Sequence, residues 1–282
     1  MARVIASGTY TEPVCPMCGN NAGTVKYEYP DVKIIRCESC ALWRTCPRLS
    51  LEKLTEYYEQ QYYSESREGA GRYEAWRDAN RDVWSTSARL VKAEAAQRGF
   101  GNDRPLRLLD VGSGCGFFLE QCLELGIDGR GLEVSPHAVR YSTQTLKLNV
   151  RELLLDDLPG DESYDIITLN QVLEHVPDPL ATMKQVWQHL VPGGMTWVAT
   201  PNTSALERFR HGASYFNFLN KSHLTHFHRG TLKALLEKAG FRSVRRYVHW
   251  GGGTRTGAAA LAQYAARWLC LGTELRFLAE KY

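Results

Sequence analysis

The stretch Leu108-Leu109-Asp110-Val111-Gly112-Ser113-Gly114-Cys115-Gly116-Phe117-Phe118 decides the fold of this chain. Its first four residues form a short apolar run typical of a buried strand. Three glycines follow at every second position, and an apolar helical pattern comes next. Glycine lets the backbone turn tightly and brings N–H groups close to a ligand at a helix N-terminus. The stretch therefore predicts a small-molecule cofactor site at the carboxyl edge of a parallel sheet.

The spacing of the glycines indicates which cofactor the loop serves. The dinucleotide fingerprint G-x-G-x-x-G cradles a pyrophosphate, whereas this loop is G-x-G-x-G and has Asp110 two residues before its first glycine. A carboxylate there would repel a phosphate but could help to fix a cationic ligand. Glu133 ends the next apolar run, where an acidic side chain can accept both hydroxyls of a ribose. The phosphate loop G-x-x-x-x-G-K-[ST] is absent from the sequence.

These residues resemble motif I and the following acidic residue of the class I S-adenosylmethionine (SAM)-dependent methyltransferases. Three later segments resemble the same family in the correct order: 164–176 the fourth strand and its loop, 190–195 the turn before the fifth strand, and 232–244 the last helix and sixth strand. The resemblance covers Arg104 to Tyr282. It implies a transferase enzyme with a Rossmann-like α/β domain, whose seven-stranded, mostly parallel sheet is closed by an antiparallel last strand at 273–281.

The resemblance also implies a set of SAM contacts at the carboxyl ends of neighbouring strands. Asn170 and Gln171 are expected near the methionine part. The adenine is expected to meet backbone groups of Leu154 and Leu155, with the Asp156 side chain as the alternative. The residues expected to bind the cofactor are Asp110, Gly112, Ser113, Gly114, Gly116, Glu133, Leu154, Leu155, Asp156, Asn170 and Gln171.

Three histidines are candidates for chemistry at the acceptor. A hydroxyl acceptor benefits from a general base, often a histidine or a carboxylate. His175 follows the fourth strand directly, near the expected position of the methyl group. His223 and His226 lie in the segment 201–229, which in this fold usually covers the acceptor. We expect His175 or His223 to be the base and His226 to shape the pocket, although all three could be structural.

Four cysteines near the N-terminus form two C-x-x-C pairs, Cys15/Cys18 and Cys37/Cys40. Two short strands fit between the pairs, at 24–29 and 32–36. Four thiolates at this spacing fit a closed, tetrahedral, structural zinc site. Two disulfides or free thiols are the alternative, and a cytosolic location would disfavour the disulfides. The remaining cysteines are expected to be ordinary small apolar residues.

These patterns divide the 282 residues into three parts: a zinc-ribbon-like module at 1–48, a helical linker or cap at 49–103, and the methyltransferase domain at 104–282 with a lid at 201–229. In the linker, 64–71 is expected to be a turn and 72–96 one long helix. The tyrosines Tyr57, Tyr58, Tyr62 and Tyr63 precede it and could line the cofactor cleft.

Composition and charge indicate the cellular location to expect and which classes of partner the chain could bind. No run of eighteen apolar residues exists, so no transmembrane helix is expected. The N-terminus is too short and polar for a secretory signal, and a cytoplasmic location is expected. The formal net charge is only +3. Between Cys15 and Cys40 three basic residues are matched by three acidic ones, which gives no basic stripe for phosphates.

The sequence therefore predicts SAM-dependent methyl transfer to a small-molecule or sugar/glycan acceptor, with oxygen as the expected methylated atom. The strand-four segment Asn170-Gln171-Val172-Leu173-Glu174-His175 resembles small-molecule O- and C-methyltransferases and lacks the Asn/Asp-Pro-Pro-Tyr pattern of many nucleic-acid N-methyltransferases. Sugar C-methylation stays open as an alternative. So does an RNA or protein methyltransferase whose ribbon selects the substrate, and so does a catalytically dead binding module.

Overall fold

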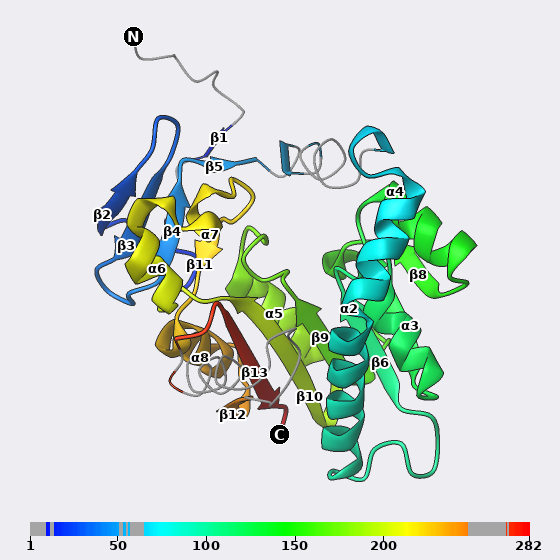
Figure 1. Cartoon of the computed structure of the whole chain (residues 1–282). Coiled ribbons are helices and arrows are strands. Elements are labelled where there is room, and N and C mark those ends of the chain that lie inside the picture. The colour runs from blue at the N-terminus through cyan, green and yellow to red at the C-terminus, as the bar shows by residue number, and fades with distance from the viewer. Residues whose placement is uncertain are drawn as a thin grey trace.

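The computed structural model describes residues 10–11, 14–50, 53–54, 56, 65–247, 269 and 271–282 (Figure 1). The tyrosines of 57–63 lie outside the described residues, so their expected place at the cofactor cleft stays a prediction. Among the described residues there are a seven-stranded sheet, a four-stranded sheet and a two-stranded pair. None of the described helices combines the length and apolarity that a membrane crossing requires.

The seven-stranded sheet has the order β12-β13-β10-β9-β6-β7-β8. Neighbouring strands from β10 to β8 pair in parallel, and β13 runs antiparallel to both β10 and β12. The expected sheet with an antiparallel last strand is thus confirmed. Its strands are β6 (Arg107–Val111), β7 (Asp128–Glu133), β8 (Asn149–Glu152), β9 (Tyr164–Asn170), β10 (Leu190–Pro201), β12 (Arg242–Arg246) and β13 (Glu274–Glu280).

Both faces of this sheet are buried. Alternate residues of each strand point to opposite sides, and both sets of side chains lie in apolar clusters. Leu108 and Ile166 belong to one apolar cluster, and the adjacent Leu109 and Ile167 belong to the other. Helices α2 and α3 contribute to the first cluster, and α5 and α8 to the second. The helices are α2 (Glu65–Ala96), α3 (Phe117–Glu124), α4 (Pro136–Arg140), α5 (Pro179–His189) and α8 (Arg229–Lys238), with a π-turn at Tyr141–Thr145 and a 3₁₀ turn at Leu155–Asp157.

Helix α2 begins at Glu65, so the turn expected over residues 65–71 is wrong and the long helix is one piece from there to Ala96. It packs beside α3 (Figure 1). Ala88, Val91 and Ala95 are fully buried in that contact. Farther toward the helix start, Trp76 lies 5.6 Å from Phe117, centroid to centroid. The linker helix therefore covers the beginning of α3, which directly follows the glycine loop.

The four-stranded sheet joins two parts of the chain that are far apart in sequence. Strands β2 (Gly23–Glu28), β3 (Lys33–Cys37) and β4 (Trp43–Cys46) come from the cysteine-rich N-terminus, and the expected pair of strands between the cysteines is confirmed. The fourth strand, β11 (Thr225–His226), comes from the lid segment and pairs antiparallel with β4. The N-terminal module therefore folds onto its own catalytic domain.

Aromatic packing reinforces this joint between N-terminal module and lid. The lid contains α6 (Leu206–His211) and α7 (Phe216–Leu219), which lie beside β3 and β4 in Figure 1. Trp43 stacks on Phe218 with ring centroids 5.8 Å apart. The Tyr29 hydroxyl donates to the Ala213 carbonyl at 2.6 Å. We call this unit, residues 14–46 together with 201–229, the ribbon–lid unit. β1 (Tyr10–Thr11) and β5 (Arg48–Leu49) pair beside it.

Candidate active site

The glycine loop lies at the carboxyl end of β6 and runs into α3. Gly112, Gly114 and Gly116 have φ angles of 67°, 55° and 85°, in the left-handed region that favours glycine. A Cβ atom at Gly112 would lie 2.6 Å from Val172 Cγ2, and one at Gly116 would lie 2.5 Å from Leu148 Cδ1. The three glycines are therefore required by backbone conformation, and two of them also by close packing.

Asp110 stands beneath this loop in β6 and is almost fully buried. Its Oδ1 accepts hydrogen bonds from Thr168 Oγ1 at 2.6 Å and Asn170 Nδ2 at 3.4 Å. Burial raises the pKa of Asp110 to about 7, although these two hydrogen bonds act in the opposite direction. The strand neighbours thus hold a carboxyl that is close to half ionised at neutral pH.

Glu133, at the end of β7, ties the loop to the next strand. Its Oε2 accepts from the Gly114 N–H at 2.8 Å, and its Oε1 accepts from the N–H groups of Val134 and Ser135 at 2.8 and 2.9 Å. Burial raises the pKa of Glu133, and the three backbone donors oppose that rise. A carboxylate oxygen has two lone pairs, so Oε1 is fully used by its two donors and Oε2 keeps one acceptor position for a hydroxyl.

The residues predicted to contact the adenine lie beside Glu133. β8 pairs in parallel with β7, with Glu152 opposite Glu133, and the turn after β8 holds Leu154, Leu155 and Asp156. Leu155 is buried, whereas Leu154 and Asp156 are exposed. The three residues therefore share the sheet edge with the glycine loop, as a contact to one ligand would require.

Asn170 and Gln171 separate from each other at the end of β9. The Asn170 amide points to Asp110 under the loop. Gln171 has a φ of 57°, and its Nε2 donates to Glu274 Oε2 of β13 at 3.0 Å. The structure brings Asn170 to the loop and turns the Gln171 amide away from the loop, toward β13. Cofactor contact by Gln171 therefore stays a prediction.

The three candidate histidines lie together, although they come from two segments. The rings of His175 and His223 are 4.7 Å apart, and those of His223 and His226 are 6.3 Å apart, centroid to centroid. His175 follows β9, and the other two belong to the lid. Burial lowers the pKa of His175 to about 4 and that of His226 to about 3, and it lowers the pKa of His223 well below the usual value. All three imidazoles are therefore neutral at pH 7.

Hydrogen bonds fix the tautomers of these rings, because a carbonyl oxygen can only accept. His175 Nδ1 donates to the Ser222 carbonyl at 3.0 Å, and His223 Nδ1 donates to the Asn217 carbonyl at 3.0 Å. The Thr45 hydroxyl donates to the His223 carbonyl at 2.6 Å, so it accepts from His226 Nε2 at 3.0 Å. His226 is thus held by a residue of the N-terminal module.

Glu174 is a member of this cluster that the sequence reasoning missed. Its side chain is 1% exposed. Oε2 accepts from Thr200 Oγ1 at 2.9 Å, whereas Oε1 has no hydrogen-bond partner among the described residues and lies 3.8 Å from His175 Nε2. Burial raises the pKa of Glu174 to about 8. Its signal in the sequence was an acidic residue in an apolar run, directly before a histidine at a strand end.

The four cysteines meet as expected at the base of the ribbon–lid unit. One ligand atom from each of Cys15, Cys18, Cys37 and Cys40 lies within 4.8 Å of all the others. In each C-x-x-C pair, the N–H of the residue after the second cysteine donates a hydrogen bond to the carbonyl of the first cysteine: Gly19 to Cys15, and Ala41 to Cys37. The donor set suits tetrahedral zinc.

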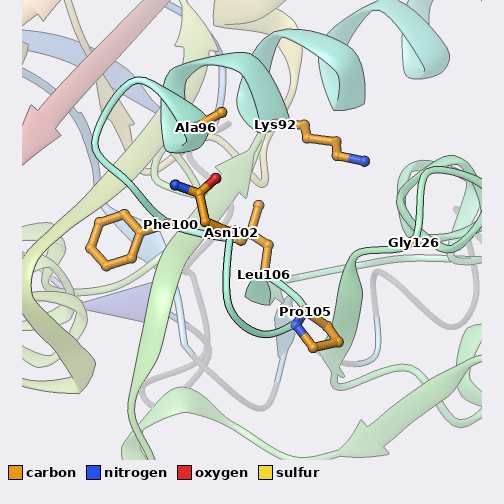
Figure 2. Close-up of a pocket in the computed structure, with 8 residues that line it drawn as sticks. Lys92, Ala96, Phe100, Asn102, Pro105, Leu106 and Gly126 are labelled. Carbon is orange, nitrogen blue, oxygen red and sulfur yellow. The ribbon is translucent and has the colours of Figure 1, made fainter.

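A separate pocket of about 200 Å³ lies at the other edge of the sheet. Figure 2 shows its lining residues, which include Phe100, Pro105, Leu106 and Gly126. Leu106 directly precedes β6 and Gly126 precedes β7, so this pocket faces the amino ends of strands whose carboxyl ends carry the glycine loop. It is small and remote from the polar clusters described above.

Comparison with known proteins identifies the fold and the family. A family model described as a methyltransferase domain matches residues 76–245, more than half of the chain. The chain belongs to this family of SAM-dependent methyltransferases.

The family resemblance is strongest over about a third of the chain. A ubiquinone biosynthesis O-methyltransferase of Xanthomonas campestris is 32% identical over 103 residues, which are 34% of this chain and 43% of that protein. The chain thus spans less than half the length of such curated relatives.

Solved structures extend the likeness of fold over most of the chain. A SAM-dependent methyltransferase of Thermotoga maritima matches with a TM-score of 0.55 and 18% identity, covering 81% of this chain and 100% of that one. A magnesium protoporphyrin IX methyltransferase of Synechocystis, solved with bound SAM, matches with a TM-score of 0.52 and 14% identity, covering 82% of this chain and 96% of that one. At these identities the likeness concerns the fold alone.

Proposed function

We propose that this protein transfers the methyl group of SAM to an oxygen atom of a small-molecule acceptor, with a sugar or glycan hydroxyl as the narrower candidate. The observation that carries the proposal is the glycine loop pinned to Glu133 at the carboxyl edge of β6 and β7. Ligands of open α/β sheets bind at this edge. The O-methyltransferase relative matched over 103 residues supports oxygen as the methylated atom.

Each predicted cofactor contact has a chemical task in this proposal. The loop around Gly112–Gly116 lets the ligand approach the backbone closely, and Glu133 can accept a ribose hydroxyl with the remaining lone pair of Oε2. Asp110 contributes negative charge under a cationic ligand. Leu154 and Leu155 flank the adenine, with Asp156 as the alternative contact. SAM, when bound, supplies an activated methyl group, so positioning provides much of the rate.

The acceptor lies, in this proposal, between the end of β9 and the lid. The His175–His223 pair handles the proton of the acceptor hydroxyl, since both imidazoles are neutral at pH 7 and carry their own proton at Nδ1. His226 shapes the pocket through its bond with Thr45. The lid consists of residues 201–229, which belong to the catalytic domain at 104–282. The N-terminal module at 1–48 supports this lid.

We also propose a structural zinc ion on the four cysteines. The sulfurs of Cys15 and Cys40 are 3.3 Å apart, and those of Cys18 and Cys37 are 3.6 Å apart. A closed four-thiolate site holds chain segments together and leaves no coordination position for a substrate. The ion would thus stabilise the ribbon–lid unit, while the chemistry stays at the histidine cluster.

Labelled methyl transfer tests the function. The protein is incubated with SAM carrying a ¹³C methyl group and, in parallel, a small-metabolite extract, RNA and a protein lysate. We expect label in the small-molecule fraction, with the ¹³C NMR shift of an O-methyl carbon, and loss of labelling in the Gly114→Val variant. Label in a C-methyl group, in RNA or in protein would contradict the proposed acceptor.

A further inference from the structure

We propose that Glu174, His175 and His223 bind one divalent transition-metal ion at the acceptor end of the active site. One ligand atom from each of the three residues lies within 4.8 Å of the other two. Two of the residues follow β9, and the third comes from the lid. The lid therefore supplies the third ligand of the set.

The histidines are prepared for this role by their outer hydrogen bonds. Protein histidines that bind metals usually donate their other ring N–H to a carbonyl or carboxylate, which fixes the ring and its tautomer. Both His175 and His223 do so, through Nδ1, to the Ser222 and Asn217 carbonyls. The lone pair is then at Nε2 in each ring. His226 differs, because its Nε2 donates to Thr45.

Glu174 provides the second, independent observation. Its Oε2 is anchored by Thr200, and Oε1 is buried without a hydrogen-bond partner among the described residues. A buried carboxyl oxygen without a hydrogen-bond partner is unfavourable. A cation on the side facing the two imidazoles would remove that cost.

The ligand types indicate the class of metal. Two imidazoles and one carboxylate with open positions suit Fe²⁺, Mn²⁺, Co²⁺ or Zn²⁺, whereas Mg²⁺ and Ca²⁺ prefer oxygen ligands throughout. The thiolates of the four-cysteine site, by contrast, select zinc. The protein would therefore hold two metal ions of different character, one structural and one at the acceptor.

This site refines the proposed function, on which its catalytic role rests. In this refinement the imidazoles would hold the ion instead of taking the proton themselves, and the cation beside the acceptor hydroxyl would lower the pKa of that hydroxyl. The O–H bond breaks and its proton goes to water. The oxygen electron pair forms the new O–CH₃ bond, and the C–S bond of SAM breaks with its electron pair passing to sulfur.

Electron paramagnetic resonance of Mn²⁺ tests the site without any acceptor. Full-length protein with zinc on its cysteines is titrated with Mn²⁺ alone, since the signal of free Mn²⁺ falls when the ion binds. We expect saturable binding of one ion per chain. Glu174→Gln and His223→Ala should weaken it by at least about tenfold, in line with losses at metal ligands and their supports. The matched exposed variants Glu207→Gln and His211→Ala should bind as the wild type does.

Calorimetry with SAM on the same samples separates this proposal from the function. Wild-type protein that binds SAM and leaves the Mn²⁺ signal unchanged overturns the metal site and leaves the function standing. Protein that binds Mn²⁺ and fails to bind SAM overturns the function and leaves the metal site standing. If the control variants lose Mn²⁺ as strongly as Glu174→Gln, the assignment of ligands is wrong.

Discussion

The cofactor edge of the sheet and the ribbon–lid unit differ in how their polar groups are brought together. At the cofactor edge, one contiguous loop after β6 makes the cradle, and Glu133 of the neighbouring strand holds it by accepting from the Gly114 N–H. The other oxygen of Glu133 accepts from the N–H groups of Val134 and Ser135, which fixes the carboxylate. At the ribbon–lid unit, side chains from distant segments meet: Thr45 and the lid histidines of the unit lie against the pair Glu174–His175, which follows β9.

This difference has a thermodynamic consequence. The loop depends on local backbone conformation and on the main sheet, so it should survive damage to the N-terminal module. The histidine cluster depends on β11 pairing with β4 and on the hydroxyl of Thr45. Perturbing the module should therefore damage the acceptor side selectively, and perturbing the loop should damage the cofactor side selectively.

The strongest expected effect is that of Gly114→Val on the cofactor side. Gly114 has a φ of 55°, which a β-branched residue rarely adopts, and a side chain there would fill the space in which the ligand approaches the backbone. We expect affinity for SAM to fall about a hundredfold or more, which corresponds to about 3 kcal/mol. Gly126→Val is the matched control, because Gly126 has a φ of 72° and open space around it. Equal losses in both variants would refute the specific role of the loop.

Cys37→Ser should strongly weaken the ribbon–lid unit and leave the cofactor edge of the sheet intact. Removing one thiolate should release the zinc ion and loosen the joint between β4 and β11. We expect metal analysis to find less zinc, and hydrogen exchange to show lost protection at Thr225 and His226. Affinity for SAM should stay within about threefold, because the two sites share no partners. Loss of SAM binding together with zinc would show that the two regions are coupled.

Thr45→Val tests the joint more finely. The variant keeps the shape of the side chain and removes the hydroxyl that bonds His223 and His226. Leaving these buried groups without a partner should lower the free energy of unfolding by about 1–3 kcal/mol. Urea denaturation measures this change. An unchanged midpoint would mean that the hydroxyl contributes nothing to the ribbon–lid contact.

The smallest effect expected is on the pH dependence of SAM binding. The pKa of Asp110 is raised to about 7 by burial, so its carboxyl is largely protonated at pH 6. A cationic ligand favours the ionised form, and binding should release a proton below pH 7. Affinity should thus increase severalfold between pH 6 and 8 and level off above that range. Calorimetry on Asp110→Asn should give a flatter profile; the same slope in this variant would assign the proton elsewhere.

The same contrast explains which parts of the fold and of the site could be predicted from the sequence. The sheet, the glycine loop and the cysteine pairs follow from contiguous patterns, and the structure brings Asp110, Asn170 and Glu133 together as those patterns predict. The start of α2 at Glu65 was missed, because glycines at 69 and 71 favour a turn, whereas the helix continues through both. Glu174 and Thr45 were missed for another reason. Their roles depend on contacts across 26 and 181 positions of the chain, to Thr200 and His226 respectively, and no local pattern reports such contacts.

Calorimetric titration of SAM and of S-adenosylhomocysteine into the wild-type protein tests the central claim most directly. The claim is that the pinned glycine loop forms a competent cofactor site by itself. We predict that both ligands bind one per chain, with dissociation constants in the low micromolar range or tighter, and that both raise the melting temperature. Folded protein that shows neither heat of binding nor a thermal shift with either ligand would contradict the account.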